Sequence, residues 1–142
     1  MKENINALDE INKGTCMGMD AIKFILDKTE DKKFKKVLKD FYKEYEKINK
    51  KIEKIYPKYN DGNPHETNII NKAMTWYGIE VKTLKDNSNS KIAELLLQGT
   101  NMGIIEGRKI LNKKEIDKKI NELIEKYVTM QEDNVEILKQ YL

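Results

Sequence analysis

Two nearly identical pentapeptides decide the fold: GTCMG at residues 14–18 and GTNMG at residues 99–103. They lie 85 positions apart, and the same offset pairs residues 14–57 with residues 99–142 without a gap. Fifteen of these 44 pairs are identical, whereas composition alone would match about four at roughly a tenth per position. The sequence therefore predicts a duplicated structural unit.

Each copy of the repeat has the periodicity of two amphipathic helices, and no stretch shows the alternation of a strand. Apolar residues recur at spacings of three and four, which predicts one buried face per helix. In the first copy this face comprises Phe34, Leu38, Phe41, Tyr45, Ile48, Ile52 and Ile55. Near the C-terminus it comprises Ile116, Ile120, Leu123, Tyr127, Met130, Ile137 and Tyr141, interrupted by Asn134. A looser face near the N-terminus comprises Ile5, Leu8, Ile11, Thr15, Met19, Ile22 and Leu26.

Turn and capping residues separate five predicted helices. YPKYNDGNP at residues 56–64 ends one helix, and Asn63, Pro64 and Glu66 then form an N-cap, a first-turn proline and a capping-box glutamate. DNSNS at residues 86–90 marks another break, and residues 112–115 offer a second capping box. We predict helices at about residues 3–27, 30–56, 64–86, 90–111 and 114–141.

The predicted fold is all-α, with one domain over residues 1–142. Two hairpins, at about residues 3–56 and 90–141, would bury each other's apolar faces in a four-helix bundle. The helix at 64–86 is long enough to cross the bundle, which predicts up-down-down-up order and pseudo-twofold symmetry. Its own apolar face should pack on the bundle, and comprises Ile70, Ala73, Met74, Trp76, Tyr77, Val81 and Leu84.

The repeated glycines call for a structural explanation. Gly14 and Gly18 lie one turn apart on one helix face, as do Gly99 and Gly103, and a helical glycine costs about 1 kcal/mol relative to alanine. We interpret them as the place where the first and third repeat helices cross with close backbone approach. The alternative is that they widen the interior to admit a ligand.

Composition excludes several classes of function. Glu and Asp are interspersed among the lysines and the net charge is only +3, a pattern that argues against a nucleic-acid partner. No apolar run approaches a membrane span and the N-terminus lacks a signal core, so neither membrane insertion nor export is expected and the location should be cytoplasmic. Cys16, the one cysteine, is predicted to be a small buried residue. His65, the one histidine, is predicted at the surface.

Four segments, KGTCMGMDAIKFIL, LLLQGTNMGIIEGRKIL, YKEYEKINKKIEKIY and MQEDNVEILKQYL, resemble the ferritin-like superfamily. The resemblance is closest to its small bacterial four-helix-bundle proteins of the DUF2383 type. It implies a site for two iron or manganese ions, with one Glu from each of two helices and a Glu-x-x-His from each of the other two.

The implied metal ligands are incomplete in this chain. Glu46-x-x-Asn49 and Gln131-x-x-Asn134 stand where the Glu-x-x-His motifs would be, and neither contains histidine. Asp20 and Glu106 are the nearest carboxylates on the other two helices, but the repeat does not relate them. We therefore predict a degenerate site with no catalytic, cofactor-binding or metal-binding residue. If iron or manganese is bound, the weak candidate ligands are Glu46, Asn49, Gln131 and Asn134.

Asn49 and Asn134 are instead interpreted as hydrogen-bonded interior amides, near each other or near Thr15 and Thr100. The favoured function is a non-enzymatic interaction or scaffold protein that self-associates or binds a protein partner. One alternative is a metal-binding or oxidoreductase protein with an incomplete or intersubunit carboxylate site. A weaker alternative is an apolar-ligand carrier.

Overall fold

A computed structural model of the chain describes residues 2–60 and 72–142. Within these ranges it contains α1 (Lys2–Leu26), α2 (Lys32–Ile55), α3 (Lys72–Lys82), α4 (Asn89–Leu111) and α5 (Lys118–Lys139). A short 3-10 helix, η1 (Tyr56–Lys58), follows α2, and the described residues form no strand. The predicted all-helical fold class is confirmed.

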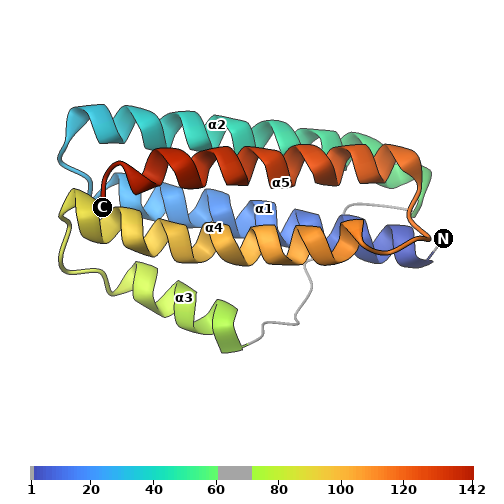
Figure 1. Cartoon of the computed structure of the whole chain (residues 1–142), viewed down its shortest axis with the longest axis horizontal. Helices are drawn as coiled ribbons and strands as arrows, with labels where there is room; N and C mark the ends of the chain where they lie inside the picture. Colours follow the sequence, from blue (N-terminus) through green and yellow to red (C-terminus); the bar gives the residue numbers. More distant parts are fainter. Residues whose placement is uncertain (1, 61–71) are drawn as a thin grey trace.

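Two helical hairpins make up the bundle (Figure 1). The most extensive contacts are those of α1 with α2 and of α4 with α5, and the hairpins meet through α1 with α4 and α2 with α5. The colours in Figure 1 show α1 and α5 running in one direction and α2 and α4 in the other. The shorter helix α3 lies outside the four and contacts only α1 and α4 among the principal helix pairs.

The apolar face predicted for α2 is the one that the bundle buries. Its six residues from Phe34 to Ile52 are at most 5% exposed, and Ile55 is half-buried. At the end of the bundle the Phe34 ring stacks on Tyr141, with ring centroids 4.1 Å apart. The α2 pattern is clean because lysine or glutamate fills nearly every outward position.

The face predicted for α5 is partly wrong. Ile137 is 37% exposed, and Leu138 is buried in its place. The buried residues Tyr127, Gln131, Asn134 and Leu138 follow spacings of four, three and four, which a straight helix keeps on one side. The side chains of Gln131 and Asn134 thus belong to the buried face of α5, which ends with Leu138.

The duplicated halves share local structure but not burial. The Thr15 hydroxyl donates to the Ile11 carbonyl oxygen at 2.7 Å, and the equivalent Thr100 hydroxyl donates to Leu96 at the same distance. In contrast, Ile52 is fully buried whereas its equivalent, Ile137, is not. The two hairpins therefore present different side chains to the interior.

Two predicted boundaries differ from the structure. The described part of the crossover is helical only to Lys82 rather than to 86, and the Lys28 ammonium donates to the Leu84 carbonyl oxygen at 2.9 Å just beyond it. Asn112 is the C-cap of α4, so it cannot cap the next helix, and α5 begins at Lys118 instead of 114. The break at 86–90 is confirmed, with Ser88 as N-cap.

The crossover's predicted contacts are mixed. Tyr77 and Val81 are buried, but Trp76 is 48% exposed. Among the principal helix pairs α3 contacts only α1 and α4, so the bundle covers one face of α3 and leaves the other exposed. The predicted capping box at residues 63–66, His65 and Ile70 lie outside the described residues.

Candidate ligand pocket between α1 and α4

The four repeated glycines line a pocket of about 810 Å³ between α1 and α4, and Gly107 lines it with them. Protein pockets for small molecules commonly measure roughly 300–1,000 Å³. The glycines thus border an interior space, which is the arrangement that the second interpretation of the repeat describes.

Side chains, not the backbone of the opposite helix, lie closest to these glycines. A Cβ atom added at Gly14 would overlap the Tyr127 hydroxyl, one at Gly99 the Tyr77 ring, and one at Gly103 the Gln131 amide. At Gly18 it would lie 2.7 Å from Cζ of Tyr45. The crossing predicted from the sequence placed backbone against backbone. The structure instead uses the missing Cβ atoms to seat tyrosine and glutamine side chains.

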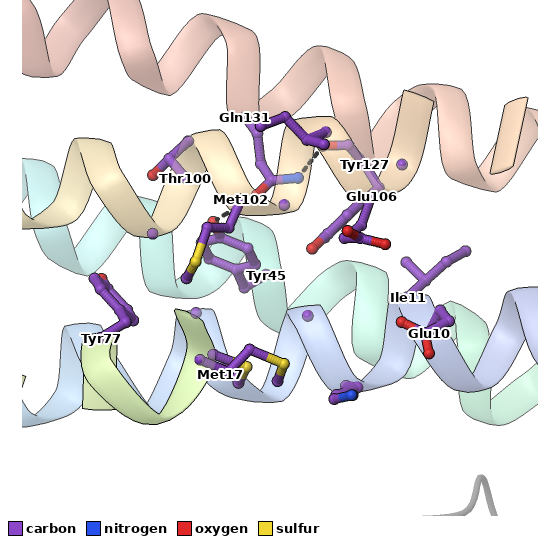
Figure 2. Close-up of a pocket in the computed structure, with 18 of the residues that line it drawn as sticks. Glu10, Ile11, Met17, Tyr45, Tyr77, Thr100, Met102, Glu106, Tyr127 and Gln131 are labelled. Carbon is purple, nitrogen blue, oxygen red and sulfur yellow. Dashed lines mark hydrogen bonds between the residues drawn. The ribbon is translucent and has the colours of Figure 1, made fainter. Parts of the chain in front are cut away.

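The pocket has a buried floor, which we define as its lining residues on α2 and α5: Phe41, Tyr45, Tyr127, Gln131, Asn134 and Leu138. All six are at most 4% exposed. The Tyr45 hydroxyl donates to Oε1 of Gln131 at 3.3 Å, and Nε2 of Gln131 donates to the Tyr127 carbonyl oxygen at 3.3 Å. Figure 2 shows Tyr45, Gln131 and Tyr127 close to one another, with the bond between Gln131 and Tyr127 dashed.

The tyrosines of the pocket are held in the neutral form. Burial is the main cause that raises the pKa of Tyr45, Tyr77 and Tyr127 far above the ordinary value of 10.0. The neighbouring Tyr45 hydroxyl adds to the rise for the other two. These hydroxyl groups therefore remain neutral hydrogen-bonding groups throughout the physiological pH range.

Asn134 is the one floor residue with an unpaired buried donor. It is 2% exposed, and its Nδ2 has no hydrogen-bond partner among the described residues. Its repeat equivalent Asn49 is half-buried, donates to Oδ1 of Asn12 at 3.2 Å, and does not line the pocket. The prediction that Asn134 is interior is confirmed, but it is not the hydrogen-bonded amide that the sequence suggested.

The two ends of the pocket differ in polarity. Tyr77, Met74 and Ala73 of α3 line one end. The charged lining residues come from the first half of α1, from the second half of α4 and from the turn that follows α4: Asp9, Glu10, Lys13, Glu106, Lys109 and Lys113. Figure 2 shows Glu10 and Glu106 at the end opposite to Tyr77.

Three methionines also line the pocket: Met17 on α1, Met74 on α3 and Met102 on α4. Met17 and Met102 are equivalent in the repeat and extend into the space between their helices (Figure 2). Thioethers are soft, uncharged groups that suit apolar ligands and soft metal ions.

The candidate iron or manganese ligands do not assemble into a site. Gln131 and Asn134 line the pocket, whereas Glu46 and Asn49 do not, and the Glu46 carboxylate lies 3.8 Å from the Lys50 ammonium at the surface. In residues 2–60 and 72–142, no group of three His, Cys, Asp or Glu side chains could hold a metal ion. Two amides are poor ligands for hard cations that prefer carboxylate oxygen, so the donor set does not fit the di-metal centre.

The remaining candidates lie away from the floor. Asp20 is exposed and does not line the pocket, whereas Glu106 does. Cys16 is exposed, so its predicted burial is wrong; it sits one position beyond the inward Thr15, where a helix turns its next side chain outward.

Several pocket residues could not be recognised from sequence as ligand-facing. Tyr45 and Tyr127 have the spacing of ordinary core residues, and nothing in that spacing separates a cavity lining from a filled core. The usable signal was the glycine pair on each wall, since a glycine in mid-helix leaves room for something else.

None of the described helices has both the length and the apolar character needed to cross a membrane. No family model matches the chain, and no curated protein does. Two solved structures are similar to it, CopM in the Cu(II)-bound form and CopM in the Cu(I)-bound form. Their TM-scores are 0.78 and 0.76 at 11% and 12% identity, and each comparison covers 97% of this chain and 94% of the other. At this identity the likeness shows a shared helical-bundle fold.

Proposed function

We propose that the protein binds a small, largely apolar molecule in the pocket between α1 and α4. The observation that carries the proposal is the volume of about 810 Å³ bordered by five helical glycines. Side chains such as Tyr45 and Gln131 occupy the places of the missing Cβ atoms, and the space between the walls stays open beside them at a volume typical of small-molecule pockets.

A neutral fluorescent probe tests the proposal. We expect N-phenyl-1-naphthylamine to bind the wild-type chain with increased emission, and Met17→Trp to weaken binding by about tenfold by filling the pocket, equivalent to about 1.4 kcal/mol. The matched control is Met130→Trp, since Met130 is also half-buried but does not line the pocket. Failure of the wild type to bind, or equal weakening by both variants, would count against the proposal.

Cu(I) binding is a second candidate function. The three pocket thioethers favour it, and the similar CopM structures are copper-bound forms. Thioether sulfur is among the ligand types that select Cu(I).

Competition with a coloured Cu(I) chelator under reducing conditions tests this candidate. We expect the double variant Met17→Leu with Met102→Leu to lower the Cu(I) affinity by about tenfold or more. The control is Met19→Leu with Met130→Leu, two methionines outside the pocket. Stoichiometric Cu(I) binding that survives the first pair and is lost with the second would exclude the pocket as the site.

We also propose a ferritin-like relationship and self-association. The directions of the four bundle helices support the first, although the di-metal ligands are missing. Exposed apolar side chains such as Trp76 and Ile105 support the second. Sedimentation of the purified chain over a concentration series would show whether it is monomeric.

A further inference from the structure

We propose that the molecule in this pocket presents an uncharged polar group, a hydroxyl or a carbonyl, to Asn134 on the pocket floor. Its apolar body then occupies the space between α1 and α4. This inference rests on the proposed function and specifies the chemical class of the ligand.

The Asn134 amide is the first reason. It lines the pocket, it is 2% exposed, and its Nδ2 donates to no group in the described parts of the chain. Protein atoms cover Nδ2 as it stands, although Asn134 as a residue lines the pocket. Buried donors are almost always paired, so this missing partner points to one from outside the chain that the amide meets on turning toward the pocket. A half-turn about Cβ–Cγ exchanges the places of Nδ2 and Oδ1, so the amide can offer either its donor or its acceptor end to a ligand.

The floor's lack of charge is the second reason. Its six residues carry no ionisable group except two tyrosine hydroxyls, which burial keeps neutral. A carboxylate or an ammonium placed there would lose its hydration without meeting an opposite charge. The desolvation of a hydroxyl or a carbonyl group costs far less, and the amide can form a hydrogen bond with either group.

The polarity of the walls is the third reason. Ile11, Met17, Leu96 and Met102 line the sides, and Tyr77 closes the α3 end. The charged lining residues lie in the first half of α1, in the second half of α4 and just beyond α4, and Figure 2 shows two of them, Glu10 and Glu106, at the opposite end. An apolar body therefore suits the middle of the pocket, with its one uncharged polar group directed at the floor.

A set of twelve-carbon competitors tests the inference. We expect 1-dodecanol and 2-dodecanone to displace N-phenyl-1-naphthylamine at concentrations about tenfold lower than dodecanoate or dodecyltrimethylammonium, all used as monomers. Asn134→Leu should remove most of this preference while probe binding remains. Asn49→Leu is the matched control, because Asn49 is the repeat equivalent outside the pocket, and it should leave the preference unchanged.

The outcomes separate the two proposals. Tighter binding of either ion, or a preference that Asn134→Leu leaves intact, overturns the inference while the pocket's binding function stands. If the wild type binds no probe, the proposed function fails and the inference fails with it. Melting curves establish that each variant is folded, and Asn134→Ala replaces Asn134→Leu if the larger side chain is not accommodated.

Discussion

Raising the pH above 10 is expected to unfold the protein cooperatively between about pH 11 and 13. Tyr45, Tyr77 and Tyr127 have folded-state pKa values raised far above the 10.0 of an exposed tyrosine, chiefly through burial. Below the unfolded-state pKa both states are protonated, so the contribution of these groups to stability is fully present. Above it only the unfolded chain ionises, and stability falls.

The expected slope is large. Each such tyrosine lowers the free energy of unfolding by about 1.4 kcal/mol per pH unit above 10, so three lower it by about 4 kcal/mol per unit. The total free energy of unfolding of a single domain is about 5–15 kcal/mol. Urea unfolding at several pH values gives the slope, and it should fall by about a third in Tyr77→Phe, whose hydroxyl is absent. Tyrosinate absorbance should appear together with the loss of helical circular dichroism. Full ionisation of all tyrosines in a chain that is still helical would contradict the prediction.

Gly18→Leu is expected to lower the free energy of unfolding by about 1–3 kcal/mol. Even the Cβ atom would lie 2.7 Å from Cζ of Tyr45, a buried ring that can move only by displacing its neighbours. For a chain of this size, that loss corresponds to a melting temperature lower by roughly 3–10 °C. Thermal and urea denaturation measure both quantities.

Gly78→Leu is the matched control for this substitution. Gly78 is also helical, but a Cβ atom there meets nothing within 4 Å. Removing a helical glycine without a clash should stabilise the chain by about 0.5–1 kcal/mol. Adding Tyr45→Ala to Gly18→Leu should cost less than the sum of the two single changes, because each relieves the other's strain. If Gly18→Leu and Gly78→Leu behaved alike, Tyr45 would not be seated on Gly18.

The sequence predicts well what depends on helix periodicity and local chemistry. The α2 face from Phe34 to Ile52 is buried as predicted, because strict spacing and charged outer positions leave one orientation. Ser88, within the predicted break, caps the N-terminus of α4. These features depend on residues a few positions apart, and the sequence contains those relations directly.

Periodicity says less about what lies opposite a given face. Gly18 was placed correctly in a helix interior, but only the three-dimensional arrangement shows that a tyrosine ring covers it. Ile137 shows the same limit. Gln131 and Asn134 belong to the buried face of α5, and the apolar residue that follows them on that face is Leu138, so Ile137 is left exposed. The pocket depends on distances between hairpins, which no local pattern determines.

The duplication has a consequence for the stoichiometry and orientation of binding. The walls contain three identical repeat-related pairs, Gly14 with Gly99, Met17 with Met102 and Gly18 with Gly103, on helices that run in opposite directions. Along these three pairs, a molecule turned end over end would meet the same side chains. The floor contains no such pair, and α3 lines only one end. A chain with two repeat-related hairpins thus has one pocket between them rather than two. Because its floor is not repeated, the two orientations of an elongated molecule in that pocket would not be equivalent, as they would be between two identical hairpins.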